Sequence, residues 1–294
     1  MTKLKYEQND DEETSPKKQI QQPGVEEEMI PAPIYESDEY KGSGKLSGKN
    51  ALITGGDSGI GRAVAVAFAK EGANVAIAYL DKAEDVDAEK TVKHIVKYGG
   101  KAMMIRIDIS KETNCEKLID DVITEFGSLN ILVNNAGIQF PQTSIADITS
   151  DQLRETFETN FFGMFYLSKA ALEHMENGDS IINTSSVTAY NGSASLIDYS
   201  ATKGAITTFT RSLALNLVGK GIRVNAVAPG PIWTPLIPAT FDKKRAKQHG
   251  EDTPMKRSGQ PAENAPAYVF LASSDSSYMT GQTIHVNGGD FVGS

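Results

Sequence analysis

The chain has 294 residues, of which 39% are hydrophobic and 23% are charged, enough apolar material for a sizeable core. Its 29 Lys and Arg residues against 38 Asp and Glu residues give a formal net charge of −9, which disfavours binding to nucleic acid. The one cysteine, Cys115, excludes an intramolecular disulfide and a multi-cysteine metal site. The first residues lack the apolar core of a signal peptide, and no later run is apolar enough to span a bilayer. We therefore expect a cytoplasmic protein without a membrane partner.

Residues 1–44 differ in composition from the rest of the chain. They hold 11 acids, 5 lysines and 4 of the 12 prolines. Such a segment has too little apolar surface to offset the entropy lost on ordering. We expect an acidic extension that is partly disordered or docked, with Met29–Tyr40 extended along the folded domain. It would serve as a solubilising tail, or act at the active site or in assembly.

From Gly48 onward, short β-rich runs alternate with helical stretches. Strands are expected at Asn50–Thr54, Asn74–Leu80, Lys101–Ile109, Asn130–Val133, Ser180–Thr184, Gly221–Val227 and Gln282–Val286. Helices are expected at Gly61–Glu71, Ala83–Tyr98, Ser110–Phe126, Ser150–Met175, Tyr199–Val218 and Ala262–Ser274. Seven strands with six intervening helices predict an α/β fold with a doubly wound parallel sheet flanked by helices on both faces. We expect one Rossmann-type domain over residues 45–294.

A glycine-rich turn, TGGDSGIG at Thr54–Gly61, follows the first strand and leads into a helix. Glycines let the backbone approach a pyrophosphate, whose charge the helix N-terminus then meets. The spacing Gly55-x3-Gly59-x-Gly61 is not the commoner GxGxxG, but the strand–turn–helix context favours a dinucleotide. Asp81 follows Gly61 by twenty residues, where an acid favours NAD. The acidic side chain of Asp57 also disfavours binding of the 2′-phosphate of NADP. The nearby Lys82 nevertheless leaves NADP as the alternative cofactor.

A catalytic group is expected on the helix that begins near Asp198. Tyr199 and Lys203 are four residues apart and share one helical face. An ammonium group near a phenol stabilises the phenolate and lowers the phenol pKa from about 10, which permits acid–base chemistry near neutrality. Thirteen residues before Tyr199, Ser186 follows a predicted strand at the sheet edge where ligands bind.

These motifs, in this order, resemble the classical short-chain dehydrogenase/reductase family over about residues 45–289. The subgroup that it resembles is the bacterial glucose/ribitol-dehydrogenase-like enzymes with an acidic N-terminal extension. The matching motifs are TGGDSGIG, Asp108, Asn134-Asn135-Ala136-Gly137, Asn160, Ser186, Tyr199 with Lys203, and Pro229-Gly230 before Thr234. Glucose dehydrogenases of the family commonly carry Arg where this chain has Leu80, which favours NAD.

The resemblance implies a role for each matching residue. Tyr199 would exchange a proton with the substrate oxygen, which Ser186 would hold. Lys203 would lower the Tyr199 pKa and bind the nicotinamide ribose, and Asn160 would bind a water that links Lys203 to solvent. The cofactor contacts implied are Gly55, Asp57, Ser58, Gly59, Ile60, Gly61, Leu80, Asp81, Asp108, Ile109, Asn135, Ala136, Gly137, Tyr199, Lys203, Pro229, Gly230, Ile232 and Thr234.

The activity expected is hydride transfer between a nicotinamide cofactor and a small alcohol or ketone, with a polyol or sugar-like compound among the candidates. Gln139, Thr188, Tyr190 and Trp233 follow the relevant strand ends and are expected to line the substrate pocket. The four histidines have no metal-ligand spacing, so no metal is expected. Two alternatives stay open: an NADP-dependent acyl-thioester ketoreductase, and a non-catalytic nucleotide sensor on the same fold.

Two further expectations concern mobility and assembly. The proline-rich segment 231–259 lacks a strand pattern and follows Thr234, so we expect a substrate lid there, with a short helix around Asp242–Gln248. The family resemblance implies a homotetramer. The aromatic helix Ser150–Met175 and the C-terminal strand and tail would supply its interfaces.

Overall fold

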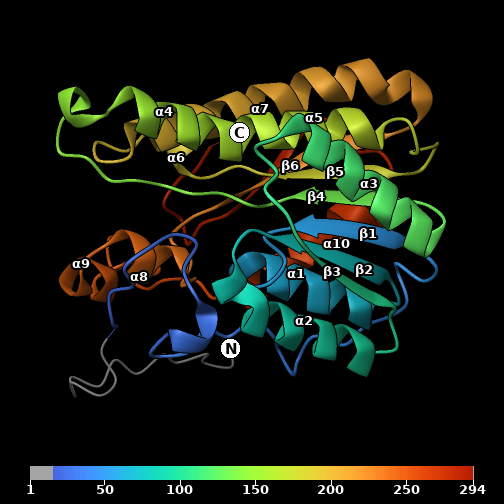
Figure 1. Cartoon of the computed structure of the whole chain (residues 1–294), viewed down its shortest axis with the longest axis horizontal. Helices are drawn as coiled ribbons and strands as arrows, with labels where there is room; N and C mark the ends of the chain where they lie inside the picture. Colours follow the sequence, from blue (N-terminus) through green and yellow to red (C-terminus); the bar gives the residue numbers. More distant parts are fainter. Residues whose placement is uncertain (1–15, 294) are drawn as a thin grey trace.

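Seven parallel strands form the centre of the structure, a computed structural model that describes residues 16–293 (Figure 1). They are β1 (Asn50–Thr54), β2 (Asn74–Tyr79), β3 (Ala102–Arg106), β4 (Ile131–Asn134), β5 (Ser180–Thr184), β6 (Arg223–Pro229) and β7 (Thr283–Val286). Their order in the sheet is β3-β2-β1-β4-β5-β6-β7. The chain runs outward from β1 to β3 and then returns to β4 on the other side of β1. This reversal makes the β1–β4 boundary the point where a doubly wound sheet binds its ligand.

Successive side chains of a strand point to opposite faces of the sheet, and here both faces are buried. Ala51 and Ile53 of β1 join one core cluster, and Leu52 between them joins the other. The first cluster includes helices α1 (Gly59–Lys70), α2 (Asp85–Lys97) and α10 (Pro261–Ala272). The second includes α3 (Glu112–Phe126), α5 (Gly163–Ala171) and α7 (Ile197–Leu217). Figure 1 shows these two groups of helices below and above the sheet. The predicted fold class is confirmed.

Some predicted boundaries differ from the structure. The helix predicted over Ser150–Met175 consists of α4 (Ser150–Phe157), a π-helical turn (Glu158–Phe162) and α5, which ends at Ala171. The strand predicted to reach Ile109 ends at Arg106, because its partner β2 ends at Tyr79, opposite that residue. Short helices α6 (Thr188–Asn191), α8 (Leu236–Thr240) and α9 (Lys243–Lys247) lie in the connections after β5 and β6.

The described part of the acidic extension packs against the domain. Lys70 of α1 forms an ion pair with Glu36 at 2.8 Å. The indole N–H of Trp233 donates to the Pro31 carbonyl at 2.9 Å, and the Gln19 amide donates to the Pro238 carbonyl at 2.9 Å. The extension therefore bonds to α1 and to the segment that follows β6. The prediction for residues 1–15 lies outside the described residues.

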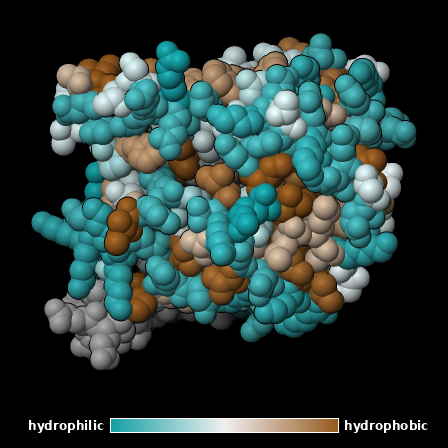
Figure 2. Space-filling view, viewed as in Figure 1, coloured by the Kyte–Doolittle hydropathy of each residue, from teal (hydrophilic) through white to brown (hydrophobic). Residues whose placement is uncertain are grey.

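The surface seen in Figure 2 is hydrophilic over most of its area, with hydrophobic side chains in small patches between charged and polar ones. Within residues 16–293, no helix is long and apolar enough to cross a membrane. The same residues contain no group of three or more His, Cys, Asp or Glu side chains that could hold a metal ion.

Candidate active site

A cleft of about 690 Å³ opens at the carboxyl ends of the strands, across the β1–β4 boundary. Most of the residues predicted to bind a cofactor or substrate line it: Gly55, Asp57, Ser58, Gly59, Ile60, Leu80, Asp108, Ile109, Asn135, Ala136, Gly137, Gln139, Ser186, Thr188, Tyr199, Lys203, Pro229, Gly230, Ile232 and Thr234. The predicted residues outside this lining are Gly61, Asp81, Asn160, Tyr190 and Trp233.

The glycine-rich turn has the conformation that its sequence requires. Gly55 and Gly59 have φ values of +61° and +51°, a left-handed region that side chains rarely adopt. Gly61 does not line the cleft because it packs behind the turn, where an added Cβ would lie 1.8 Å from the Gly55 carbonyl oxygen. Asn135 ties β4 to the turn, since its side-chain amide donates to the Thr54 and Gly55 carbonyls at 3.1 and 3.2 Å. The turn thus places the N-terminus of α1 at the cleft, where its amides other than that of Gly59, which bonds to Glu26, suit a pyrophosphate.

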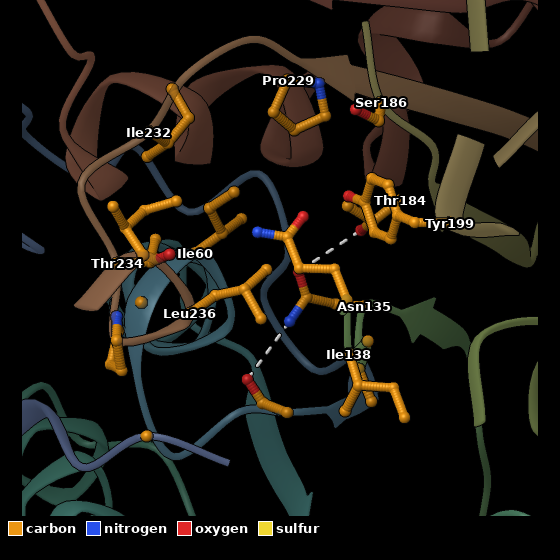
Figure 3. Close-up of a pocket in the computed structure, with 18 of the residues that line it drawn as sticks. Ile60, Asn135, Ile138, Thr184, Ser186, Tyr199, Pro229, Ile232, Thr234 and Leu236 are labelled. Carbon is orange, nitrogen blue, oxygen red and sulfur yellow. Dashed lines mark hydrogen bonds between the residues drawn. The ribbon is translucent and has the colours of Figure 1, made fainter. Parts of the chain in front are cut away.

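Ser186, Tyr199 and Lys203 come together at the other side of the cleft. Figure 3 shows Tyr199 beside Ser186 and Thr184, across the pocket from Ile60, Thr234 and Leu236. The Ser186 hydroxyl lies close enough to the Tyr199 phenol to influence its pKa. The Lys203 Nζ lies 5.4 Å from the centre of the Tyr199 ring and donates to the Thr184 carbonyl at 2.9 Å.

Burial dominates the acid–base properties of this group. It raises the pKa of Tyr199 to about 12, although the nearby Ser186 hydroxyl acts in the opposite direction. Burial also lowers the pKa of Lys203 to about 8. The expected lowering of the Tyr199 pKa by Lys203 stays a prediction, since burial dominates here and the Lys203 ammonium is directed at the Thr184 carbonyl. At pH 7 the phenol holds its proton, as a general acid must.

Asn160 lies directly behind Lys203, in the π-helical turn. Its side-chain oxygen accepts from the Ile138 amide at 2.8 Å, and its nitrogen donates to the Ile138 carbonyl at 2.9 Å. A Cβ added to Gly137 would lie 3.4 Å from the Asn160 Oδ1 and 3.6 Å from the Lys203 Nζ. Asn160 therefore holds the backbone after β4 next to the lysine. π-Turns inside helices occur often at functional sites.

The adenosine end of the cleft contains acids that the sequence patterns only partly indicated. Asp57 is buried, but Asp81 is exposed and caps a short turn by accepting from the Ala83 amide at 2.8 Å. Glu84, which was missed, lines the cleft in its place and is 4% exposed. Burial and the Asp57 carboxylate raise the pKa of Glu84 to about 8.

Two residues predicted in the substrate pocket lie elsewhere. Tyr190 packs against the rings of His285 and Phe291, with ring centres 4.5 and 4.9 Å away. Trp233 is 4% exposed and bonds to Pro31 of the extension. Both sites depend on segments remote in sequence, so strand-end position alone could not reveal them. Gln139 and Thr188 do line the cleft.

The segment 231–259 borders the cleft with α8 and α9, and α9 is the short helix expected around Asp242–Gln248. Its two ends pair as a parallel bridge between Ile232 and Gly259, with the Trp233 amide donating to the Gly259 carbonyl at 2.9 Å. Its movement as a lid stays a prediction.

A doubly wound parallel sheet with a glycine-rich turn and a Ser–Tyr–Lys group on the same edge defines a Rossmann-type oxidoreductase. The family described as Enoyl-(Acyl carrier protein) reductase matches residues 55–290. The chain belongs to the short-chain dehydrogenase/reductase family.

Individual relatives place it within that family. It is 60% identical to the Uncharacterized oxidoreductase YhdF of Bacillus subtilis (strain 168), over 94% of this chain and 95% of that protein. It is 51% identical to the Glucose and ribitol dehydrogenase of Daucus carota, over 94% and 97%. A short chain dehydrogenase from Burkholderia cenocepacia J2315, solved in complex with NADP, matches with a TM-score of 0.78 and 33% identity, over 84% of this chain and 99% of that chain. The predicted glucose/ribitol-dehydrogenase-like subgroup is confirmed.

Proposed function

We propose that this enzyme transfers a hydride between a nicotinamide cofactor and a small alcohol or carbonyl compound, with Tyr199 as the general acid/base. The observation that carries the proposal is the buried contact between the Tyr199 phenol and Ser186, with Lys203 on the next turn of α7. Ser186 also accepts from the Thr188 amide at 3.2 Å, which fixes its hydroxyl in the cleft.

In the reductive direction, Tyr199 donates its proton to the carbonyl oxygen, which Ser186 holds by a hydrogen bond. In oxidation the phenolate accepts the alcohol proton. The cofactor, when bound, supplies or accepts the hydride at the substrate carbon. Lys203 and the glycine-rich turn would hold the ribose and phosphates of the cofactor, and Asn160 would order the water that resupplies the proton.

The acids at the adenosine end support a preference for NAD. An ionised Asp57 or Glu84 would repel the 2′-phosphate of NADP in a site of low dielectric. The related Burkholderia structure holds NADP, so preference for NADP is the competing outcome. Calorimetric titration with each cofactor compares the affinities of the enzyme for NAD and NADP. Tighter binding of NADP would overturn the NAD assignment.

The substrate class needs a direct screen. Glucose, ribitol, small ketones and aldehydes are offered with NAD(H) and with NADP(H), and the absorbance of the reduced nicotinamide is followed. Acetoacetyl-coenzyme A tests the acyl-thioester alternative. Turnover of a polyol or small carbonyl supports the proposal. Cofactor binding without turnover of any compound would favour the nucleotide-sensing alternative.

We also propose that the chain works as a homotetramer in the cytoplasm. Large apolar side chains are exposed on α7 and around the start of α5: Phe162, Phe165 and Leu215 are 41%, 44% and 78% exposed. Rings on these elements pack together, with Phe165 and Phe209 centred 5.5 Å apart. A matching surface on a second subunit would bury these side chains. The low cysteine content supports the proposed cytoplasmic location. A monomeric mass in light scattering at micromolar concentration would contradict the assembly.

A further inference from the structure

Three residues of the acidic extension, Gln22, Pro23 and Gly24, line the same cleft as Tyr199 and Lys203. Figure 1 shows the described start of the chain beside α8 and α9, at the carboxyl edge of the sheet. A solubilising tail has no need to reach this edge. The contacts on either side of these residues show how the segment is fixed there.

At one end, Gln22 is bonded to the loop after β4. Its side-chain nitrogen donates to the Gln139 carbonyl at 2.6 Å, and its oxygen accepts from the Gln139 amide at 3.1 Å. These two bonds satisfy both backbone groups of a residue that is 4% exposed and lines the cleft. The Gln139 side chain in turn donates to the Thr240 hydroxyl of α8 at 3.2 Å. Gln22 therefore fixes the position of a cleft residue at its backbone.

At the other end, Glu26 is bonded to the glycine-rich turn. Its carboxylate accepts from the Gly59 amide at 2.6 Å and forms an ion pair with Arg62 of α1, and both side chains are almost fully buried. The Glu26 amide donates to Asp87, which also pairs with Arg62 at 2.8 Å. Ser58, the residue before α1, makes no side-chain cap. Glu26 thus caps α1 and satisfies an amide of the turn from a remote segment.

Between these anchors the segment is closely packed. A Cβ added to Gly24 would lie 2.6 Å from the Pro235 carbonyl oxygen and 2.6 Å from the Gln19 side-chain oxygen. Further along, Met29 is 5% exposed and belongs to the apolar cluster that contains Tyr199 and Trp233. The segment is held by ionic, polar and apolar contacts together.

We propose that residues 19–29 are a wall of the active site, with Gln22 positioning the substrate end and Glu26 positioning the glycine-rich turn. The kinetic part of this inference rests on the proposed function. The two anchors should have separable effects. Loss of the Gln22 contacts frees the Gln139 backbone, whereas loss of Glu26 frees the Gly59 amide and leaves Arg62 buried with one fewer partner.

The test uses the full-length chain with Gln22→Ala and Glu26→Ala, and with Lys18→Ala and Glu39→Ala as controls at exposed positions outside residues 19–29. We expect Gln22→Ala to raise the KM of the substrate found in the screen about three- to tenfold, with kcat and cofactor affinity within about twofold. We expect Glu26→Ala to weaken cofactor binding about tenfold in calorimetry, because the glycine-rich turn loses the bond that holds its Gly59 amide in position. The controls should match the wild type.

Hydrogen exchange gives a readout that needs no turnover. In the wild type the Gln139 amide should be protected, and in Gln22→Ala its exchange should be at least about tenfold faster. If Glu26→Ala folds poorly, Gly24→Val provides a second test, because its side chain collides with Pro235 and should displace the wall. Unchanged exchange at Gln139 in both Gln22→Ala and Gly24→Val would overturn the proposal. Faster exchange in an enzyme that turns over nothing would instead contradict only the proposed function.

Discussion

Lys203 should destabilise the folded protein. Burial lowers its pKa from 10.5 to about 8. Since one pKa unit corresponds to about 1.4 kcal/mol, the charged side chain costs the folded, cofactor-free protein about 3 kcal/mol at pH 7. Its hydrogen bond to the Thr184 carbonyl returns about 1 kcal/mol. Lys203→Met, which keeps the length of the side chain, should therefore raise the free energy of unfolding by about 2 kcal/mol.

The pH dependence of this gain has a definite sign. The folded pKa lies below the unfolded one, so between pH 8 and pH 10.5 the unfolded chain binds more protons. Wild-type stability then gains from this group as the pH rises through that window. The advantage of Lys203→Met should accordingly shrink and vanish by about pH 10, where the folded lysine is already neutral.

Urea unfolding of the cofactor-free proteins at pH 7 and pH 10 measures both effects, with Lys220→Met as a control at an exposed lysine. Activity should be lost in Lys203→Met and retained in the control. The reasoning is refuted if Lys203→Met is no more stable than the wild type at pH 7. A gain of equal size at both pH values would show that packing, and not charge, is responsible.

Three further predictions concern the cleft. Tyr199→Phe should lower kcat by about 10²–10⁴-fold while the Kd of the cofactor, from calorimetry, stays within about twofold; retention of most of kcat would contradict the assignment, and Tyr278→Phe is the surface control. Because the pKa of Glu84 is raised to about 8, it gains charge as the pH rises from 6 to 9. The affinity for NADP should therefore fall relative to NAD over that range, and Glu84→Gln should remove this dependence; an unchanged ratio in the wild type would exclude Glu84 from cofactor selection. Hydrogen exchange across residues 233–259 should slow when cofactor and substrate are bound, and unchanged exchange would eliminate the lid.

The sheet and the glycine-rich turn could be predicted because their signals are local. Buried strands such as Asn50–Thr54 contain an apolar run at their centre. Each strand is followed by a helix or turn whose sequence marks where it begins. Tyr199 and Lys203 are four residues apart on one helix, so their proximity follows from helix geometry alone. Ser186 joins them because parallel strands bring their carboxyl ends to one edge.

The contacts that escaped prediction are those made between remote segments. Trp233 follows a strand end, which suggested the pocket, but its indole bonds to Pro31, some two hundred residues away. Glu84 resembles its neighbours in a charged stretch until the fold buries it against Asp57. Glu26 lies in an acidic run whose composition did not show whether it docks, and its buried bonds to Arg62 and the Gly59 amide depend on residues more than thirty positions away. A sequence pattern indicates which residues of a helix or strand are buried. It does not indicate which charged residue from a distant part of the chain will contact them.

The bridge between Ile232 and Gly259 has a consequence for how enzymes of this shape diversify. Because the bridge brings both ends of the intervening segment together at the end of β6, the entropy of closing that loop depends only weakly on its length. A change in the number of residues between these two positions therefore alters the closure entropy little, provided that the contacts of Trp233 and Pro238 with the N-terminal extension are kept. Transplanting the segment between relatives would therefore require that its partners in the extension, such as Pro31 and Gln19, be transplanted with it.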